Sequence, residues 1–351
     1  MKSGKLPDRT DDRVLTHRSL LIVGVFASTV VLLVLVWYLI DVLLLVFAAV
    51  LLAIILRAPT DWLVRHTGLW PSWALVVVIL GIVALLGVAG WLFGATVSEQ
   101  MGQLTRRIPE IIGDITKRLE QYAWIIQRIQ PEKLLEGSPE FLGKGIQVIT
   151  ATFGAVAGFV IVIVLGVFLA VQPGLYVQGA VQLVPLHKRK RAEEVLTAVG
   201  RILRWWLVGQ LVLMLMVGLL SGVGLLLLGV PLALALGLLT GLLNFIPYLG
   251  PILAAVPAIL VALAESPLLA GYVLVLYIGI QALEGNVLEP IVQQRAVYLP
   301  PALILFAQIV LGILVGVLGV MLATPLAAAL LVAVKMLYVE DVLGAEPKAA
   351  R

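Results

Sequence analysis

The chain is built around long stretches that contain no Lys, Arg, Asp or Glu. The longest runs from residue 205 to 264, and others cover 67–98, 145–187 and 296–334. A charge at the centre of a membrane-spanning helix costs about 2.5–3.5 kcal/mol on insertion scales, and one span needs about 20 apolar residues. The charge-free stretches therefore predict an all-α polytopic membrane protein.

The composition agrees with this class. Hydrophobic residues make up 62% of the chain and charged residues 13%, against about 45–50% and 25% in a soluble domain. Such a balance excludes a soluble enzyme, a disordered chain and a nucleic-acid binder with a basic face. The chain has no cysteine, so we expect no disulfide framework and no thiolate metal site. We also predict no cofactor and no bound metal.

We predict about eight transmembrane helices. The first apolar run, 20–56, is too long for one crossing, so we expect a tight pair of helices with Asp41 near the turn. The remaining predicted segments are 72–97, 146–171, 205–229, 231–264, 267–284 and 301–336. The segment 231–264 is broken by Gly and Pro, and it either crosses once or is re-entrant.

The predicted organisation follows from these segments. Its parts are a cytoplasmic tail (1–18), transmembrane segments 1–3 (19–97), an amphipathic helical insert (98–145), transmembrane segment 4 (146–171), a basic cytoplasmic connector (172–204), transmembrane segments 5–8 with the transport motifs (205–337) and a second cytoplasmic tail (338–351).

Basic residues gather in four blocks between these segments. The blocks are Lys2 to Arg18, Arg57 with Arg65, Lys188 to Arg204, and Lys335 to Arg351. With eight crossings all four blocks fall on one side, which is the cytoplasm by the positive-inside rule. Both termini are therefore predicted to be cytoplasmic. We interpret Lys188–Arg191 as a topology determinant beside anionic head groups rather than as a regulatory or nucleotide site.

The insert near 98–141 carries six basic and seven acidic residues. This near-neutral balance lacks the bias of a cytoplasmic loop and predicts an extracytoplasmic position. Apolar residues recur every three or four positions, which predicts an amphipathic helix, with Pro109 as a kink or a restart. We favour a packing or interfacial helix, and a subunit-contact arm remains the alternative.

Both asparagines of the chain lie in its apolar C-terminal half. Asn244 stands in the phrase Leu-Leu-Asn-Phe-Ile-Pro-Tyr-Leu-Gly-Pro, which contains Pro247, Tyr248, Gly250 and Pro251. Such a phrase cannot continue an ordinary helix without freeing backbone carbonyls. In a membrane, freed carbonyls are tolerated where protein or a water-filled cavity satisfies them, as in the broken helices of transporters. The alternative is a kinked helix with a packing role.

The second asparagine, Asn286, stands in a phrase with Gln281, Glu284 and Glu289. Gln281 and Glu284 are three residues apart and share a face if the helix continues to them. An ionisable group at membrane depth is costly and is usually paired or functional. Glu284 is a candidate to carry a proton or bind a cation, and Arg295 to neutralise Glu284 or Glu289. A solvated loop at the outer surface is the alternative.

The last apolar segment contains regularly spaced small residues. Gly312, Gly316 and Gly319 precede Pro325, and small residues at this spacing allow helices to approach closely. We therefore predict a helix-packing face that also permits sliding against the broken segment.

These three C-terminal motifs, in this order, resemble those of the autoinducer-2 exporter (AI-2E) family of bacterial membrane proteins. Leu56, Pro59, Asp61, Trp62 and Leu63 also resemble the pattern of that family's first loop. The resemblance covers nearly the whole chain and implies a multi-pass protein of the bacterial cytoplasmic (inner) membrane. It also implies export of autoinducer-2, or sodium or lithium/proton antiport in some members. A homo-oligomer is implied, with a pentamer as one option.

Together these observations predict an exporter of a small polar solute. We expect it to be ATP-independent, because the chain contains no P-loop motif. The alternatives are a cation/proton antiporter and a non-transporting membrane scaffold. An enzyme is not expected, since His17, His66 and His187 all lie in charged loops. The predicted partners are membrane lipid, a small polar solute or cation, and further copies of the chain, with no nucleic acid. The predicted substrate or gating residues are Asn244, Pro247, Tyr248, Gly250, Pro251, Gln281, Glu284 and Asn286, and the coupling candidates are Glu284, Glu289 and Arg295.

Overall fold

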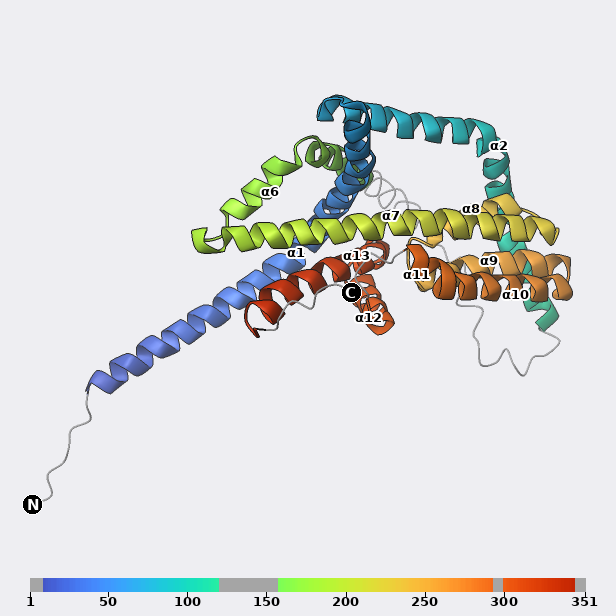
Figure 1. The fold of residues 1–351 in the computed structure, drawn as a ribbon. Coiled ribbons are helices and arrows are strands. Elements are labelled where there is room, and N and C mark those ends of the chain that lie inside the picture. The colour runs from blue at the N-terminus through green and yellow to red at the C-terminus, as the bar shows by residue number, and fades with distance from the viewer. Residues whose placement is uncertain (1–8, 120–156, 293–298, 345–351) are drawn as a thin grey trace, which may run out of the picture.

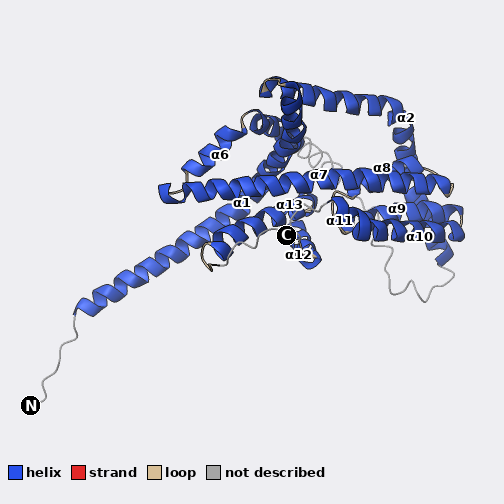
Figure 2. Cartoon of the chain, in the orientation of Figure 1, coloured by secondary structure: helices blue, strands red, loops and turns tan. Residues whose placement is uncertain are grey.

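The computed structural model describes residues 9–119, 157–292 and 299–344, and all regular structure in these ranges is helical (Figures 1 and 2). Five of the described helices are long and apolar enough to cross a membrane, or six if the bent pair Ala157–Val171 and Pro173–Gln182 counts as one span. The all-α multi-pass class is thus confirmed, and a count of about eight remains a prediction.

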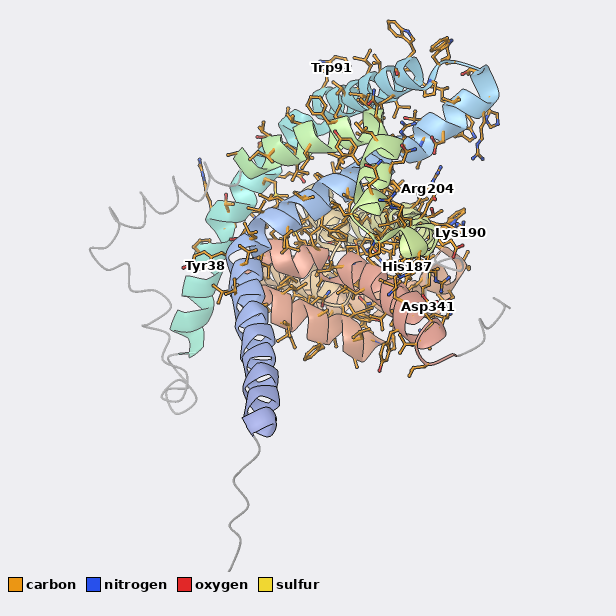
Figure 3. The ribbon with its side chains drawn as sticks, turned by 90° about the vertical axis from the view of Figure 1, so that its left-hand side faces the viewer. Tyr38, Trp91, His187, Lys190, Arg204 and Asp341 are labelled. Atoms are coloured by element: carbon orange, nitrogen blue, oxygen red, sulfur yellow. The ribbon has the colours of Figure 1, made fainter. Side chains whose placement is uncertain are left out.

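The outer surface of the described chain is rich in exposed apolar side chains. Tyr38 and Trp91 project from α1 (Arg9–Thr67) and α2 (Pro71–Leu119) with 80% and 82% of their surface exposed (Figure 3). Exposed apolar side chains also cover the helix Ala157–Val171. A large exposed apolar surface is the arrangement that suits contact with lipid.

The N-terminal region forms one continuous helix. Helix α1 has 59 residues and continues without interruption past Asp41, so the predicted turn at Asp41 is wrong. Residues 25–58 contain no Gly and no Pro, which are the residues that most readily end a helix. Excess length over one bilayer crossing does not by itself impose a turn.

Arginine side chains fasten α1 to later parts of the chain. Arg204 forms an ion pair with Asp61 at 3.1 Å and donates to the carbonyl of Ala58 at 3.1 Å. Arg57 donates to the carbonyls of Ala170 and Val171 at 2.6 and 2.9 Å. Arg57 thus caps the last carbonyls of the helix Ala157–Val171.

Helix α2 contains the described part of the predicted insert. It continues through Pro109 to Leu119, and Figure 1 shows its C-terminal part descending across the α8–α10 region. Leu104 is buried in the apolar cluster that α8, α9 and α10 share. Gln100 Oε1 accepts a hydrogen bond of 3.0 Å from the backbone N–H of Ala235. The described part of the insert therefore packs within the chain, and residues 120–145 lie outside the described residues.

Helix α7 is the axis on which the C-terminal half is assembled (Figure 1). It has 39 residues, a length of about 58 Å. From residue 173 onward the elements in chain order are α6 (Pro173–Gln182), η2 (Leu186–Lys188), α7 (Arg189–Leu227), α8 (Ala233–Leu243), α9 (Leu249–Glu265), α10 (Pro267–Leu283), η3 (Glu284–Leu288), α11 (Glu289–Val292), α12 (Pro301–Val315), α13 (Val317–Val334) and η4 (Lys335–Glu340).

The two halves of α7 contact different partners. Leu225, near its C-terminus, packs in one cluster with residues of α8, α9 and α10. Leu203 and Trp206, in its N-terminal half, pack with Leu322 of α13 and Leu44 of α1. The C-terminal half of α7 thus packs with α8, α9 and α10, and its N-terminal half packs with α1 and α13.

The predicted segment 301–336 is two helices rather than one. Helices α12 and α13 meet at Gly316, whose φ of +73° suits glycine. A Cβ atom at Gly312 would contact the Val320 side chain at 2.8 Å, and one at Gly319 would clash with the Leu311 carbonyl. These glycines therefore permit close packing inside the α12–α13 hairpin.

Candidate functional site

The broken segment 231–264 folds back on itself. Helix α8 begins where α9 ends, because Leu232 and Ala233 share one buried cluster with Val261 and Ala262. The same cluster includes Leu225 at the far end of α7. The chain reverses direction at residues 244–248, between α8 and α9, so the segment is a helical hairpin. We call residues 244–248 the hairpin tip.

Local sequence explains why the reversal occurs at the tip. A Cβ atom on Gly250 would clash with the carbonyl of Leu243, so only glycine allows this approach of α9 to α8. Tyr248 has a positive φ of 65°, a conformation that residues other than glycine rarely adopt. Pro247 cannot donate a backbone hydrogen bond and so cannot continue α8.

Glycines bring the hairpin into close contact with α7. A Cβ on Gly237 would lie 2.6 Å from Gly222 Cα, and a Cβ on Gly241 would lie 2.9 Å from the carbonyl oxygen of Met214. Two helices can approach this closely only where side chains are absent. Because α8 packs closely along α7, the C-terminal end of α8 lies beside Gln210 of α7.

Asn244 is the centre of the buried polar contacts at the tip. Its side chain is 1% exposed, and its Nδ2 donates a hydrogen bond of 2.8 Å to Glu284 Oε1. Its backbone carbonyl accepts a hydrogen bond of 2.6 Å from Gln210 Nε2. Glu284 is buried where α10 passes into the π-helical turn η3. Three separate helices therefore meet at one asparagine.

A second amide holds the tip from the opposite unit. Gln308 of α12 is 1% exposed, and its Nε2 donates a hydrogen bond of 3.0 Å to the carbonyl of Pro247. The tip carbonyls of Asn244 and Pro247 thus accept hydrogen bonds from side chains of α7 and α12, and that of Pro247 also accepts one of 2.8 Å from the backbone N–H of Leu249. This satisfies the requirement that irregular backbone in a membrane be paired within the protein.

Three side chains at the hairpin tip each carry a buried oxygen without a partner among the described residues. The atoms are Asn244 Oδ1, Glu284 Oε2 and Gln308 Oε1. Leaving a buried acceptor unsatisfied costs about 1–3 kcal/mol. Such oxygens can accept hydrogen bonds from a polar ligand, bind a cation, or, in the case of Glu284, carry a proton.

The structure brings together only some of the predicted site residues. Asn244, Pro247 and Glu284 meet at the tip, and Gly250 and Pro251 are buried at the start of α9. Tyr248 is half-buried beside them.

The other predicted residues lie apart from this contact. Gln281 is exposed and does not share the buried face of Glu284, which contradicts the predicted common face. Asn286 is also exposed, and its side chain donates to the carbonyl of Ala282 at 2.8 Å. Glu289 is half-buried, and Arg295 lies outside the described residues.

Sequence reasoning missed the two glutamines that hold the tip. It also missed Thr240, whose hydroxyl hydrogen-bonds the Tyr277 hydroxyl at 2.8 Å between α8 and α10. Gln210, Gln308 and Thr240 are uncharged polar residues inside charge-free runs. That property is a usable signal, because an amide in an apolar helix needs a partner.

Comparisons of the sequence with known proteins find a family match and several relatives. A family model described as "AI-2E family transporter" matches residues 26–338. The YueF protein of Bacillus subtilis (strain 168) is 29% identical over 271 residues, which cover 73% of each chain. The YhhT protein of Escherichia coli (strain K12) is 24% identical over 344 residues, covering 91% of this chain and 89% of its own. The AI-2 transport protein TqsA of Escherichia coli (strain K12) is 24% identical over 294 residues, covering 79% of this chain and 81% of its own.

Proposed function

This chain belongs to the AI-2E family of transporters, and from that premise we propose that it is an ATP-independent exporter of a small polar solute such as autoinducer-2. The observation that carries the proposal is the buried contact between Asn244 and Glu284 at the tip of the hairpin. Similarity to TqsA, which is named as an AI-2 transport protein, supports autoinducer-2 as the first solute to test.

In the proposed mechanism the hairpin tip is the gate. A polar solute offers hydrogen-bond donors to the free oxygens of Asn244 and Glu284. A solute that donates to Glu284 Oε1 and accepts from Asn244 Nδ2 replaces both halves of the Asn244–Glu284 contact, so the tip can part from α10 without burying an unpaired group. Glu284 acts as the coupling residue, because gain or loss of a proton changes whether Oε2 donates or accepts.

The close glycine contact between α7 and α8 supports a movement of this kind. Gly222 and Gly237 present no side chains to each other, so the hairpin can shift along α7 without exchanging rotamers. The packing of Leu104 against the hairpin would hold the end of the hairpin opposite the tip during the shift.

We place the protein in the bacterial inner membrane with both termini in the cytoplasm. Ion pairs bring the basic blocks around Arg57, Lys188–Arg204 and Lys335 to one side of the chain, and by the positive-inside rule these three blocks support a cytoplasmic C-terminus. The cytoplasmic N-terminus rests on its own lysines and arginines, because the single helix α1 separates them from the other blocks. A homo-oligomer fits the many apolar side chains that remain exposed on the single chain. Transport rather than catalysis is the proposed activity.

Efflux from liposomes that contain the purified protein tests the proposal. We expect autoinducer-2 or a related polar solute to leave faster than from empty liposomes, at a rate that depends on pH. Glu284→Gln should abolish the pH dependence while the protein still inserts. Glu265→Gln is the matched control, because Glu265 is half-exposed at the end of α9 and paired with Arg107. Unchanged pH-dependent efflux in Glu284→Gln would reject the coupling role, and no efflux of any solute would favour a scaffold.

A cation/proton antiporter is the second candidate. Glu284 Oε2 and Asn244 Oδ1 are two buried oxygens without partners among the described residues, and oxygen is the ligand that small hard cations prefer. A sodium gradient imposed on the same liposomes should then move protons, as reported by an enclosed pH dye. A dye signal that does not respond to sodium or lithium would remove this candidate.

A further inference from the structure

The chain makes a sharp bend before α7 that the proposed transport mechanism does not use. Helix α6 turns 88° from the helix Ala157–Val171, and it has no buried residue. Its ten residues extend about 15 Å, which is half of a bilayer core. We call residues 173–190 the α6 elbow.

Apolar side chains project from the elbow without a covering element among the described residues. Leu183 and Leu186 are 89% and 79% exposed, and Leu175 and Tyr176 of α6 are also exposed. No charged residue occurs from 145 to 187. A surface of this kind is costly in water.

The basic residues that follow divide into two groups. Arg189 donates to the carbonyls of Gln182 and Val184 at 3.1 and 3.2 Å, which closes the elbow. Arg191 forms ion pairs with Glu194, Glu340 and Asp341 at 2.9–3.1 Å.

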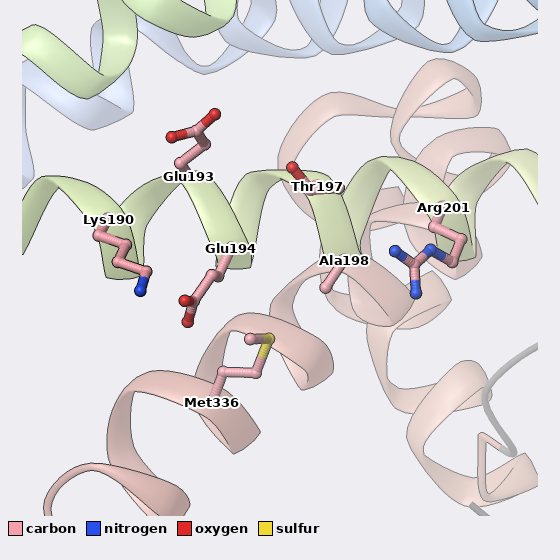
Figure 4. A pocket seen from close by; sticks show the side chains of 7 residues that line it. All are labelled: Lys190, Glu193, Glu194, Thr197, Ala198, Arg201 and Met336. Carbon is pink, nitrogen blue, oxygen red and sulfur yellow. The ribbon is translucent and has the colours of Figure 1, made fainter.

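Lys188 and Lys190 form the second group. Both are exposed and form no ion pair with the described residues. Lys190 lies at the same end of the molecule as His187 and Asp341 (Figure 3). It also lines an open pocket of about 520 Å³ on α7, with Glu193, Glu194 and Arg201 (Figure 4). Two lysines that are unpaired within the described part of the chain thus follow two exposed leucines.

We propose that the α6 elbow docks on a bilayer leaflet that contains anionic lipid. Leu183 and Leu186 enter the boundary between head groups and acyl chains, and Lys188 and Lys190 bind lipid phosphates. A short apolar helix followed by lysines has the composition of an interfacial element. Each lysine near an anionic surface strengthens such docking about fivefold. The charge next to the leucines favours lipid over a second copy of the chain as the covering partner.

The elbow is joined to the candidate transport site through one rigid element. Helix α7 continues without interruption from Arg189 to Gln210, which holds the carbonyl of Asn244. Lipid that fixes the start of α7 therefore also fixes the helix against which the hairpin tip is positioned.

Site-directed spin labelling tests the docking directly, because the chain has no cysteine of its own. A nitroxide on Leu183→Cys or Leu186→Cys should be readily reached by oxygen and poorly reached by a water-soluble nickel complex. A label on Glu193→Cys, on exposed and charged α7 surface, is the control and should be reached by nickel. Nickel access at Leu183 equal to that at Glu193 would overturn the proposal. Protection from both reagents would overturn it in favour of a protein partner.

A lipid titration tests the charge component. Protection of the Leu183 label is followed in phosphatidylcholine vesicles with an increasing fraction of phosphatidylglycerol. In the variant Lys188→Gln/Lys190→Gln the midpoint should move to an at least several-fold higher anionic fraction. Superimposable curves for the two proteins, or full protection without any phosphatidylglycerol, would contradict a role for anionic lipid. Neither result depends on the identity of the transported solute.

Discussion

Two long apolar segments of this protein each carry a polar residue, yet only one of them is broken. The segment around Asp41 lies within the uninterrupted helix α1, and the segment around Asn244 reverses direction between α8 and α9. Asp41 has neither Gly nor Pro within ten residues on either side, whereas Pro247, Gly250 and Pro251 follow Asn244 closely. A break therefore requires residues that change the backbone.

The two polar residues also differ in their partners. Asp41 is exposed and forms no ion pair with the described residues. Asn244 is buried and bonded through its side chain and its carbonyl to Glu284 and Gln210. A reversal inside an apolar segment persists where the groups that it frees are paired from neighbouring helices.

The largest effect is expected at the glycine that allows the reversal. Gly250→Ala places a Cβ against the Leu243 carbonyl, and relief of this backbone clash should cost on the order of 3 kcal/mol of unfolding free energy. Thermal or denaturant unfolding in detergent measures it. Gly285→Ala is the control, because no atom lies within 4 Å of an added Cβ there. Equal stability of the two variants would show that the tip does not need glycine.

The next effect concerns the side chain at the tip. Asn244→Leu removes the donor to Glu284 Oε1 and leaves a buried carboxyl group without its partner. We expect a loss of about 2 kcal/mol in the same unfolding assay. Asn286→Leu should change stability by less than about 0.5 kcal/mol, since Asn286 is exposed. Similar losses in the two asparagine variants would mean that the buried contact does not stabilise the hairpin.

The glutamines that hold the freed carbonyls should contribute less. Gln210→Leu and Gln308→Leu each leave one carbonyl of the tip without its amide donor, at a cost of about 1 kcal/mol. Because the two glutamines come from different helices, the losses should add in the double variant. A stabilising effect of either leucine would show that the carbonyls are satisfied in another way.

The smallest effect is expected in the unbroken segment. Asp41→Leu should change stability by no more than about 0.5 kcal/mol, because Asp41 is exposed and ends no helix. Spin labels at Val31→Cys and Val50→Cys should lie about 28 Å apart along a continuous helix. A pair of antiparallel helices would bring them to about 10 Å, and that distance would restore the predicted turn.

The sequence was sufficient for the membrane class and for the site of the break. Charge-free runs predict apolar helices, and the residues around Asn244 predict an irregular backbone. It could not decide between a single continuous helix and a hairpin, because that choice rests on how Gly237 and Gly222 pack between distant segments. Gln210 and Gln308 were missed for the same reason, since their partners are backbone carbonyls far along the chain.

The most direct test of the central claim is a double-mutant cycle on transport. Efflux is measured for the wild type, Asn244→Leu, Glu284→Gln and the double variant, each reconstituted at equal density. If the two side chains act as one gate through their 2.8 Å contact, the double variant should transport no more slowly than the slower single variant. Losses that multiply in the double variant would show that Asn244 and Glu284 act independently, and would contradict the gate.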